Sequence, residues 1–232
     1  MSVRGSAGAL ARRPGTLEQR ERTLAVAGRV LAERGFERTR LRDVAEAAGV
    51  SIGLLQNYFE TRDAMLEEAF SFMCEELIGR WREQAQLAPD PWQKIAGLIE
   101  ELMKEPDPRA HSATWTEFCS SASRHPQLRP PVVSVYHTWR RILVAAVEEG
   151  RVLGLFPPGM PASDIADAIN AEVDGLHMAM AVGAGLMDER RFSRLALGVA
   201  SALLGREDSH RTAGDHPPGV VRRSSGRRGK AR

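Results

Sequence analysis

The chain has 232 residues, of which 43% are hydrophobic and 27% charged, and this balance excludes a chain that is disordered throughout. Its longest charge-free apolar run, residues 175–187, is too short to cross a membrane, and no secretory signal is visible. Cys74 and Cys119 lie far apart and outside any CxxC spacing, which is typical of reduced thiols. We therefore expect a cytoplasmic protein with no membrane partner.

The two ends of the chain are basic and have no hydrophobic period, whereas the part between them is mildly acidic, for a net charge of +2. Residues 1–16 and 206–232 are rich in Arg, Gly and Ser, so neither segment can bury an apolar face. We predict a disordered arm and a disordered basic tail. The tail is either simply solvated or attracts phosphates without sequence preference.

Between the ends, apolar residues recur at helical spacing in almost every segment, and no strand-like alternation of useful length occurs. The predicted helices, separated mainly by Gly and Pro, cover residues 17–33, 41–48, 51–59, 62–88, 95–102, 110–122, 131–149, 162–187 and 189–204. We predict an all-α protein of about nine helices, with a three-helix domain at 17–61 and a larger helical domain at 62–205.

Residues 41–59 fit a helix-turn-helix residue by residue. Ala45 is small where two helices cross, Gly49 can supply a positive φ at the turn, and Ser51 can cap the next helix. With Leu55 turned inward, the outer face of the third helix is short, uncharged and suited to the major groove. An ordinary αα-hairpin is the alternative interpretation of this stretch taken alone.

Residues 17–66 resemble the DNA-binding domain of TetR-family transcriptional regulators. The residues that carry this resemblance are Gly35-Phe36, Asp43-Val44-Ala45, Ala48-Gly49-Val50-Ser51, Gly53, Leu55, Tyr58-Phe59 and Arg62-Asp63-Ala64-Met65-Leu66. The resemblance implies a homodimeric repressor that binds a palindromic operator in double-stranded DNA. The size and helical character of the rest of the chain, to about residue 205, agree with the family.

The resemblance places the DNA contacts at the start of the second helix, on the third helix and at the start of the fourth. The implied DNA-binding residues are Arg40, Arg42, Ser51, Ile52, Gly53, Gln56, Asn57, Tyr58 and Arg62. Gly53 lets the backbone approach the groove, Gln56 can pair with adenine, and Arg62 is expected to clamp a phosphate. Ile52 departs from the basic residue common at its position, which shifts the phosphate affinity towards Arg40 and Arg42.

Spaced residues of the second half resemble the C-terminal domain of the choline–betaine repressor subgroup of this family. They are Trp115-Thr-Glu-Phe118, His125-Pro126-Gln-Leu128-Arg129, Tyr136-His-Thr-Trp139-Arg140 and Asp174-Gly175-Leu176. The subgroup suggests a small-molecule inducer without fixing which one. The candidate pocket residues are Trp115, Phe118, Tyr136, Trp139, Asp174, His177 and Met178. An aromatic cage with one carboxylate would favour a cation, but the same aromatic residues could equally form the core of a helical domain.

The last two predicted helices, within residues 162–204, combine small residues with an apolar stripe. In the family such helices pair across a two-fold axis into a four-helix bundle, which implies a homodimer; packing within one chain is the alternative. A dimer suits DNA recognition because one short recognition helix reads too few bases alone.

No motif for an enzyme, a cofactor or a metal was found among HExxH, GxSxG, GxGxxG, the P-loop and paired histidines. We therefore expect no enzymatic activity, no cofactor and no metal. Cys119 is expected to be a buried inert thiol rather than a redox sensor. Two rival functions stay open: a ligand-independent activator or global regulator with the same fold, and a helical enzyme or protein-interaction module.

Overall fold

The computed structural model describes residues 17–206, and within them it contains nine α-helices and no strand. The helices are α1 (Leu17–Arg34), α2 (Leu41–Ala48), α3 (Ile52–Tyr58), α4 (Arg62–Leu87), α5 (Pro91–Glu101), α6 (Pro108–Arg124), α7 (Arg129–Val152), α8 (Ala162–Val182) and α9 (Glu189–Leu203), with a 3₁₀ turn, η1 (Pro126–Leu128), before α7. The predicted all-α fold is confirmed. The predictions for 1–16 and for all but the first residue of 206–232 lie outside the described residues.

Three helices, α5, α6 and α7, begin earlier than the periodicity predicted, and each has proline in its first turn. Pro91 and Pro108 occupy the first turns of α5 and α6, where the N–H that proline lacks would have no helical partner. In each case the preceding aspartate caps the helix: Asp90 Oδ1 accepts the Gln93 N–H at 2.8 Å, and Asp107 Oδ1 does the same for α6.

The eighth helix ends five residues before the predicted limit at 187. Gly183 follows Val182 with a φ of +72°, a backbone conformation that L residues rarely adopt, so the chain turns there into the loop before α9. The sequence did not indicate this helix end, because the residues after Val182 continue the apolar composition of the helix.

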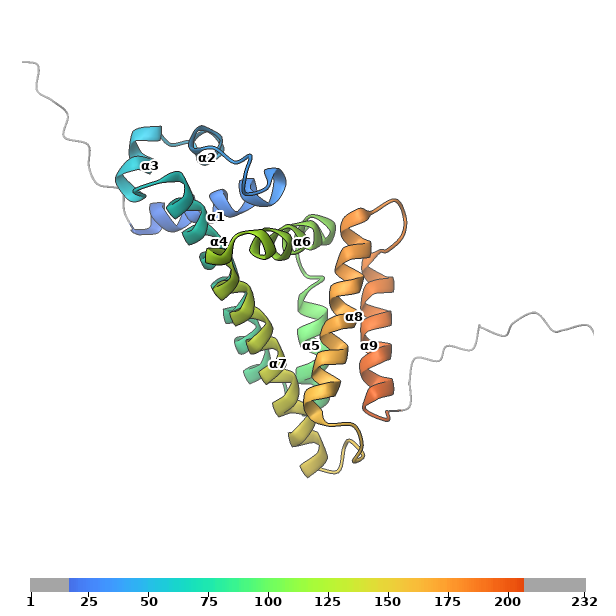
Figure 1. Cartoon of the computed structure of the whole chain (residues 1–232). Coiled ribbons are helices and arrows are strands. Elements are labelled where there is room, and N and C mark those ends of the chain that lie inside the picture. Colours follow the sequence, from blue (N-terminus) through green and yellow to red (C-terminus); the bar gives the residue numbers. More distant parts are fainter. Residues whose placement is uncertain (1–16, 207–232) are drawn as a thin grey trace, which may run out of the picture.

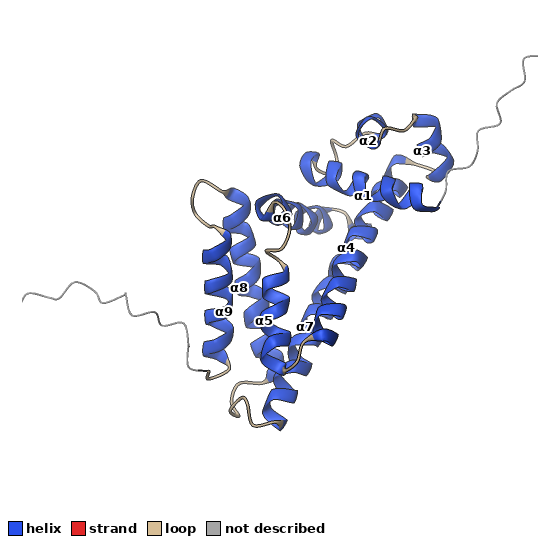
Figure 2. Cartoon of the chain, turned by 180° about the vertical axis from the view of Figure 1, so that it is seen from behind, coloured by secondary structure: helices blue, strands red, loops and turns tan. Residues whose placement is uncertain are grey.

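The helices form a small cluster and a longer bundle, as Figure 1 shows. Helices α1 to α3 gather at one end, and α4 leads from them along the length of the bundle beside α7. Helix α6 lies across the end of the bundle nearest the cluster and contacts both α1 and α8. The reverse view in Figure 2 shows α8 and α9 side by side at the far edge.

Aromatic side chains pack between the long helices inside a continuous apolar core. The rings of Phe70 on α4 and Phe118 on α6 lie 4.1 Å apart between centroids. Trp81 on α4 meets Trp139 on α7 edge-on at 4.8 Å. Over the described residues, no helix combines the length and hydropathy needed to cross a membrane.

Candidate nucleic-acid interface and internal cavities

The turn between α2 and α3 is fixed by backbone geometry. Gly49 has a φ of +64°, and the following Val50 N–H donates to the Ala45 carbonyl at 2.9 Å. Ser51 Oγ then accepts the Leu54 N–H at 3.2 Å and caps α3. These bonds, one to the backbone of α2 and one to the Ser51 side chain, set the direction of α3 relative to α2.

The outer surface of α3 presents uncharged side chains, with arginines close by at the start of α2. Ser51, Ile52, Gln56 and Asn57 are exposed, Gly53 is half-buried and Leu55 is fully buried beneath them. Arg40 is exposed, and the side chain of Arg42 is 66% exposed and 3.8 Å from Asp43 Oδ1. The structure therefore brings the predicted DNA-binding residues of α2 and α3 to one end of the molecule, available to an external partner.

Tyr58 and Arg62 differ from that group because their polar atoms have partners within the protein. Tyr58 is half-buried, and its hydroxyl donates a long hydrogen bond of 3.5 Å to Gln19 on α1. Arg62 Nε donates to the Thr39 carbonyl at 2.7 Å, Nη2 donates to the Phe36 carbonyl, and the guanidinium lies 4.9 Å from the Phe36 ring centroid. These contacts tie α4 to the loop between α1 and α2, and they occupy Nε and Nη2 of the guanidinium that the sequence predicts to clamp a phosphate.

The end of α1 also contacts α6, and this contact joins the helix cluster to the bundle. Gly35 has a φ of +78°, and a Cβ added there would lie 3.2 Å from Glu117 Oε1 on α6. At the end of α6, His125 Nε2 lies 3.1 Å from Glu37 Oε1, and the His125 ring packs tilted against the Phe36 ring, with 4.5 Å between their centroids. A displacement of α6 would therefore reach α1 directly.

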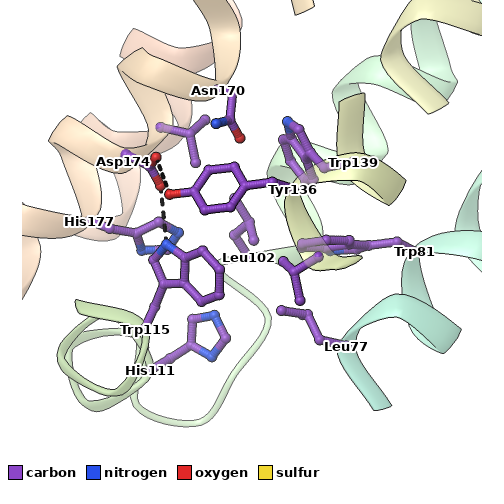
Figure 3. Close-up of a pocket in the computed structure, with 12 residues that line it drawn as sticks. Leu77, Trp81, Leu102, His111, Trp115, Tyr136, Trp139, Asn170, Asp174 and His177 are labelled. Carbon is purple, nitrogen blue, oxygen red and sulfur yellow. Dashed lines mark hydrogen bonds between the residues drawn. The ribbon is translucent and has the colours of Figure 1, made fainter. Parts of the chain in front are cut away.

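An aromatic cavity lies between α4, α6, α7 and α8, and its most polar feature is Asp174. Trp115 Nε1 donates to Asp174 Oδ1 at 3.1 Å, and the Tyr136 hydroxyl donates to Oδ2 at 2.6 Å. Figure 3 shows these two side chains converging on Asp174, with Trp81 and Trp139 on the opposite side. The cavity volume is about 30 Å³, room for a water molecule or two.

Tyr136, His177 and His111, which line this cavity, are held in their neutral forms by burial. Burial, and then the hydrogen bond to Asp174, raises the pKa of Tyr136 above its usual range. Burial, followed by the neighbouring His111, lowers the pKa of His177 to about 3, and burial also lowers the pKa of His111. His177 Nδ1 lies 2.9 Å from the Ser112 hydroxyl, which itself donates to the Pro108 carbonyl, so the Nδ1–H is the donor in that pair.

Five of the seven predicted pocket residues line the aromatic cavity: Trp115, Tyr136, Trp139, Asp174 and His177. Phe118 does not, because its ring packs against Phe70 and borders a second cavity instead. Met178 was wrongly placed in the pocket, since it is 53% exposed on the outer face of α8.

Sequence reasoning missed seven lining residues: Leu77, Trp81, Leu102, His111, Val135, Asn170 and Val173. Helical spacing could have found four of them. His111 lies four residues before Trp115, Val135 four before Trp139, Asn170 four before Asp174 and Val173 four before His177, so each shares a helix face with a predicted lining residue.

A second and larger cavity, of about 450 Å³, lies between α1, α4, α6 and the loop that joins α5 to α6. Its apolar lining includes Phe72, Met73 and Phe118. Ala25 and Arg29 of α1 also belong to its wall. Three residues, Leu77, His111 and Trp115, line both cavities and form the partition between them.

The outer face of α8 carries an exposed stripe of small and apolar residues. Ala171, Gly175, Met178 and Val182 follow one another at helical spacing, and all four are exposed. A Cβ added at Gly175 would have no atom within 4 Å. This stripe has no partner among the described residues of the same chain.

Two protein-family models match the chain. The model described as "Bacterial regulatory proteins, tetR family" matches residues 24–69, and "BetI-type transcriptional repressor, C-terminal" matches residues 91–205. The first match covers the helix-turn-helix, and the second covers α5 to α9 with most of the aromatic cavity.

Curated and solved proteins agree with these matches. The chain is 27% identical over 143 residues to the repressor KstR2 of Mycolicibacterium smegmatis, covering 61% of this chain and 69% of that protein. It is 26% identical over 203 residues to the regulator PksA of Bacillus subtilis, covering 86% and 97%. A transcriptional regulator from Saccharomonospora viridis, solved in complex with choline, has the same fold, with a TM-score of 0.70, 21% identity, and coverage of 78% and 94%.

Proposed function

Because the chain belongs to the TetR family of bacterial DNA-binding regulators, we propose that it is a homodimeric repressor that a small molecule releases from a palindromic operator. The observation that carries this proposal is the exposed, uncharged face of α3, set in direction by the Gly49 turn and accompanied by Arg40 and Arg42. Residues 17–61 would bind DNA, and 62–205 would bind the ligand and form the dimer.

The recognition surface divides naturally into base readout and phosphate contacts. Gln56 and Asn57 have amide groups that can bridge the donor and acceptor of adenine, and the Ile52 side chain can contact a thymine methyl group. Arg40 and Arg42 supply positive charge for the backbone on either side of the groove. A helix of seven residues is only about 10 Å long, so each α3 would read a few base pairs.

A second copy of α3 would come from a partner chain docked on the exposed stripe of α8. The small residues Ala171 and Gly175 permit close helix approach, and Met178 and Val182 supply apolar area. We expect Met178→Glu to produce monomers in sedimentation velocity, because it would place a charge inside the interface. Met160→Glu is the matched control, since Met160 is similarly exposed but lies in the loop before α8.

The ligand response would pass through α6, which borders both cavities and also contacts the end of α1. The aromatic cavity with Asp174 has the chemistry of an organic-cation site, and the similar Saccharomonospora viridis regulator was solved with choline. At about 30 Å³, however, the cavity has room only for a water molecule or two, so its aromatic walls would have to move apart before an organic cation could enter.

The proposal is tested by fluorescence anisotropy with a duplex that the protein has selected from random sequences. Gln56→Ala should lose discrimination against a changed base pair, and Arg42→Ala should weaken binding to all duplexes and lower the salt slope by about one. Arg82→Ala, an equal charge change on an exposed position of α4 remote from α3, should alter neither. Operator preference that survives Gln56→Ala would remove that residue from base readout. An unchanged salt slope in Arg42→Ala would remove Arg42 from the phosphate contacts.

A further inference from the structure

The larger cavity has properties that the aromatic cavity lacks, and we propose that it is a binding site for a predominantly apolar, uncharged small molecule. We infer further that its occupancy displaces α1 and so changes the affinity for DNA. Only the effect on DNA binding rests on the proposed regulatory function, because binding to the cavity can be measured without DNA.

Volume separates the two cavities. The aromatic cavity, at about 30 Å³, holds a water molecule or two, whereas the larger one, at about 450 Å³, falls within the range of sites that enclose small organic ligands. A small organic molecule fits the larger cavity without any rearrangement. The aromatic cavity would first have to widen.

The chemistry of the inner wall identifies the class of ligand. Phe72, Met73 and Phe118 are apolar. Cys74 and His111 belong to the same lining and are neutral, because burial raises the pKa of the thiol and lowers that of the imidazole. A charged group pressed against this wall would lose its hydration without gaining a counter-ion. The buried part of the ligand must therefore be uncharged.

Charged residues are confined to the more exposed part of the same cavity, and they are of mixed sign. Arg29, Glu76 and Asp107 are exposed, and Arg80 forms a 2.5 Å ion pair with Glu105. Because two arginines and three carboxylates line this part together, it selects neither a cation nor an anion strongly. It can accommodate a polar end of the ligand while that end stays in contact with water.

The coupling to DNA binding follows from the part that α1 takes in the wall. Ala25 and Arg29 border the cavity, and between them Gly28 meets Met73 of α4 so closely that an added Cβ would lie 2.6 Å from Met73 Cγ. A ligand that displaces Met73 would therefore press on α1 at Gly28. Helix α1 packs on α2, the first helix of the helix-turn-helix. A displacement of α1 would therefore move α2 and, with it, α3.

The site is tested with N-phenyl-1-naphthylamine, a neutral apolar fluorophore whose emission rises when it leaves water, added to the full-length protein. Thr114→Trp and Ala110→Trp each place an indole in the larger cavity, from a half-buried and an exposed position of α6 respectively, where folding should tolerate it. Asn170→Leu is the control, because Asn170 borders the aromatic cavity alone. We expect the tryptophan variants to bind the probe at least about tenfold more weakly than the unmodified protein, and Asn170→Leu to bind it equally well.

The outcomes that overturn the proposal are distinct. Absence of probe binding, or equal binding by both folded tryptophan variants, would exclude the larger cavity as the site. Displacement of the probe by choline would contradict an uncharged ligand. For the coupling, saturating probe should weaken binding to a selected duplex at least about tenfold, and Thr114→Trp should abolish this response. Probe binding without any change in duplex affinity would refute the coupling, and failure to select any duplex would instead count against the proposed function.

Discussion

Replacement of Arg62 by alanine should destabilise the protein, and it distinguishes the role seen in the structure from the phosphate contact that the sequence suggested. The guanidinium donates to the carbonyls of Phe36 and Thr39 and lies over the Phe36 ring. Thr39 is fully buried, and the Arg62 side chain is 26% exposed. The variant would leave both carbonyls without this donor and would release α4 from the loop that precedes α2.

The size of the effect can be estimated from these contacts. A hydrogen bond from a charged donor contributes about 1.5–3 kcal/mol, and the contact with the ring adds about 0.5–1 kcal/mol. Partial exposure and relaxation of the loop reduce the sum, so we expect a loss of about 3 kcal/mol in the free energy of unfolding. For a domain of this size that loss lowers Tm by roughly 6–12 °C. Arg62→Lys should recover less than half of it, because a lysine cannot donate in a fork.

The assay is differential scanning calorimetry of the Arg62→Ala variant beside Arg42→Ala, which removes the same charge from a largely exposed position. Arg42→Ala should leave Tm within about 1 °C of the unmodified protein and weaken DNA binding. If Arg62→Ala also left Tm unchanged while lowering the salt slope of DNA binding, the internal role would be refuted and the phosphate contact restored.

Three further predictions concern the cavities and the thiols. Tyr136→Phe removes a hydrogen bond to Asp174 and should cost about 1–2 kcal/mol in urea unfolding; no loss would mean that the bond is not maintained in solution. The pKa of His177 is about 3 when folded and 6.5 when unfolded, so its contribution to stability is complete above pH 6.5 and declines towards pH 3, by at most about 1.4 kcal/mol per pH unit. His177→Gln should flatten that slope, and an identical pH profile would contradict the assignment. Burial raises the pKa of Cys74 to about 12 and of Cys119 to about 11, so both should resist a thiol reagent at pH 8 until the protein unfolds, and rapid labelling of the native protein would exclude this environment.

The helical architecture could be predicted because apolar residues repeat with the helical period over most of the chain. The misplaced boundaries have local causes. Pro91 and Pro108 were interpreted as helix breakers, although a preceding aspartate makes each of them a helix start. At the end of α8 the residues after Val182 continue the apolar composition, and only the backbone conformation of Gly183 stops the helix.

The candidate site was predictable where a residue's role depends on its own helix, and not where it depends on a neighbour distant in the sequence. The exposure of Gln56 and Asn57 could be predicted because they lie on the face of α3 opposite the buried Leu55. Arg62 does not, because its position at a helix start suggests a phosphate contact and only folding brings the Phe36 and Thr39 carbonyls to it. The larger cavity could not be predicted from the sequence either, because its volume depends on the distances between α1, α4 and α6 in the folded chain.

The most direct test of a sequence-specific regulator is to select random DNA duplexes with the purified full-length protein at near-physiological salt and to sequence the bound fraction. The account predicts enrichment of a two-fold palindrome whose half-sites lie about one helical turn apart, or a multiple of it, as two α3 helices on a symmetric dimer require. A bound fraction with the same sequences as the unselected pool would contradict the account, because it would leave the exposed face of α3 without a sequence to recognise.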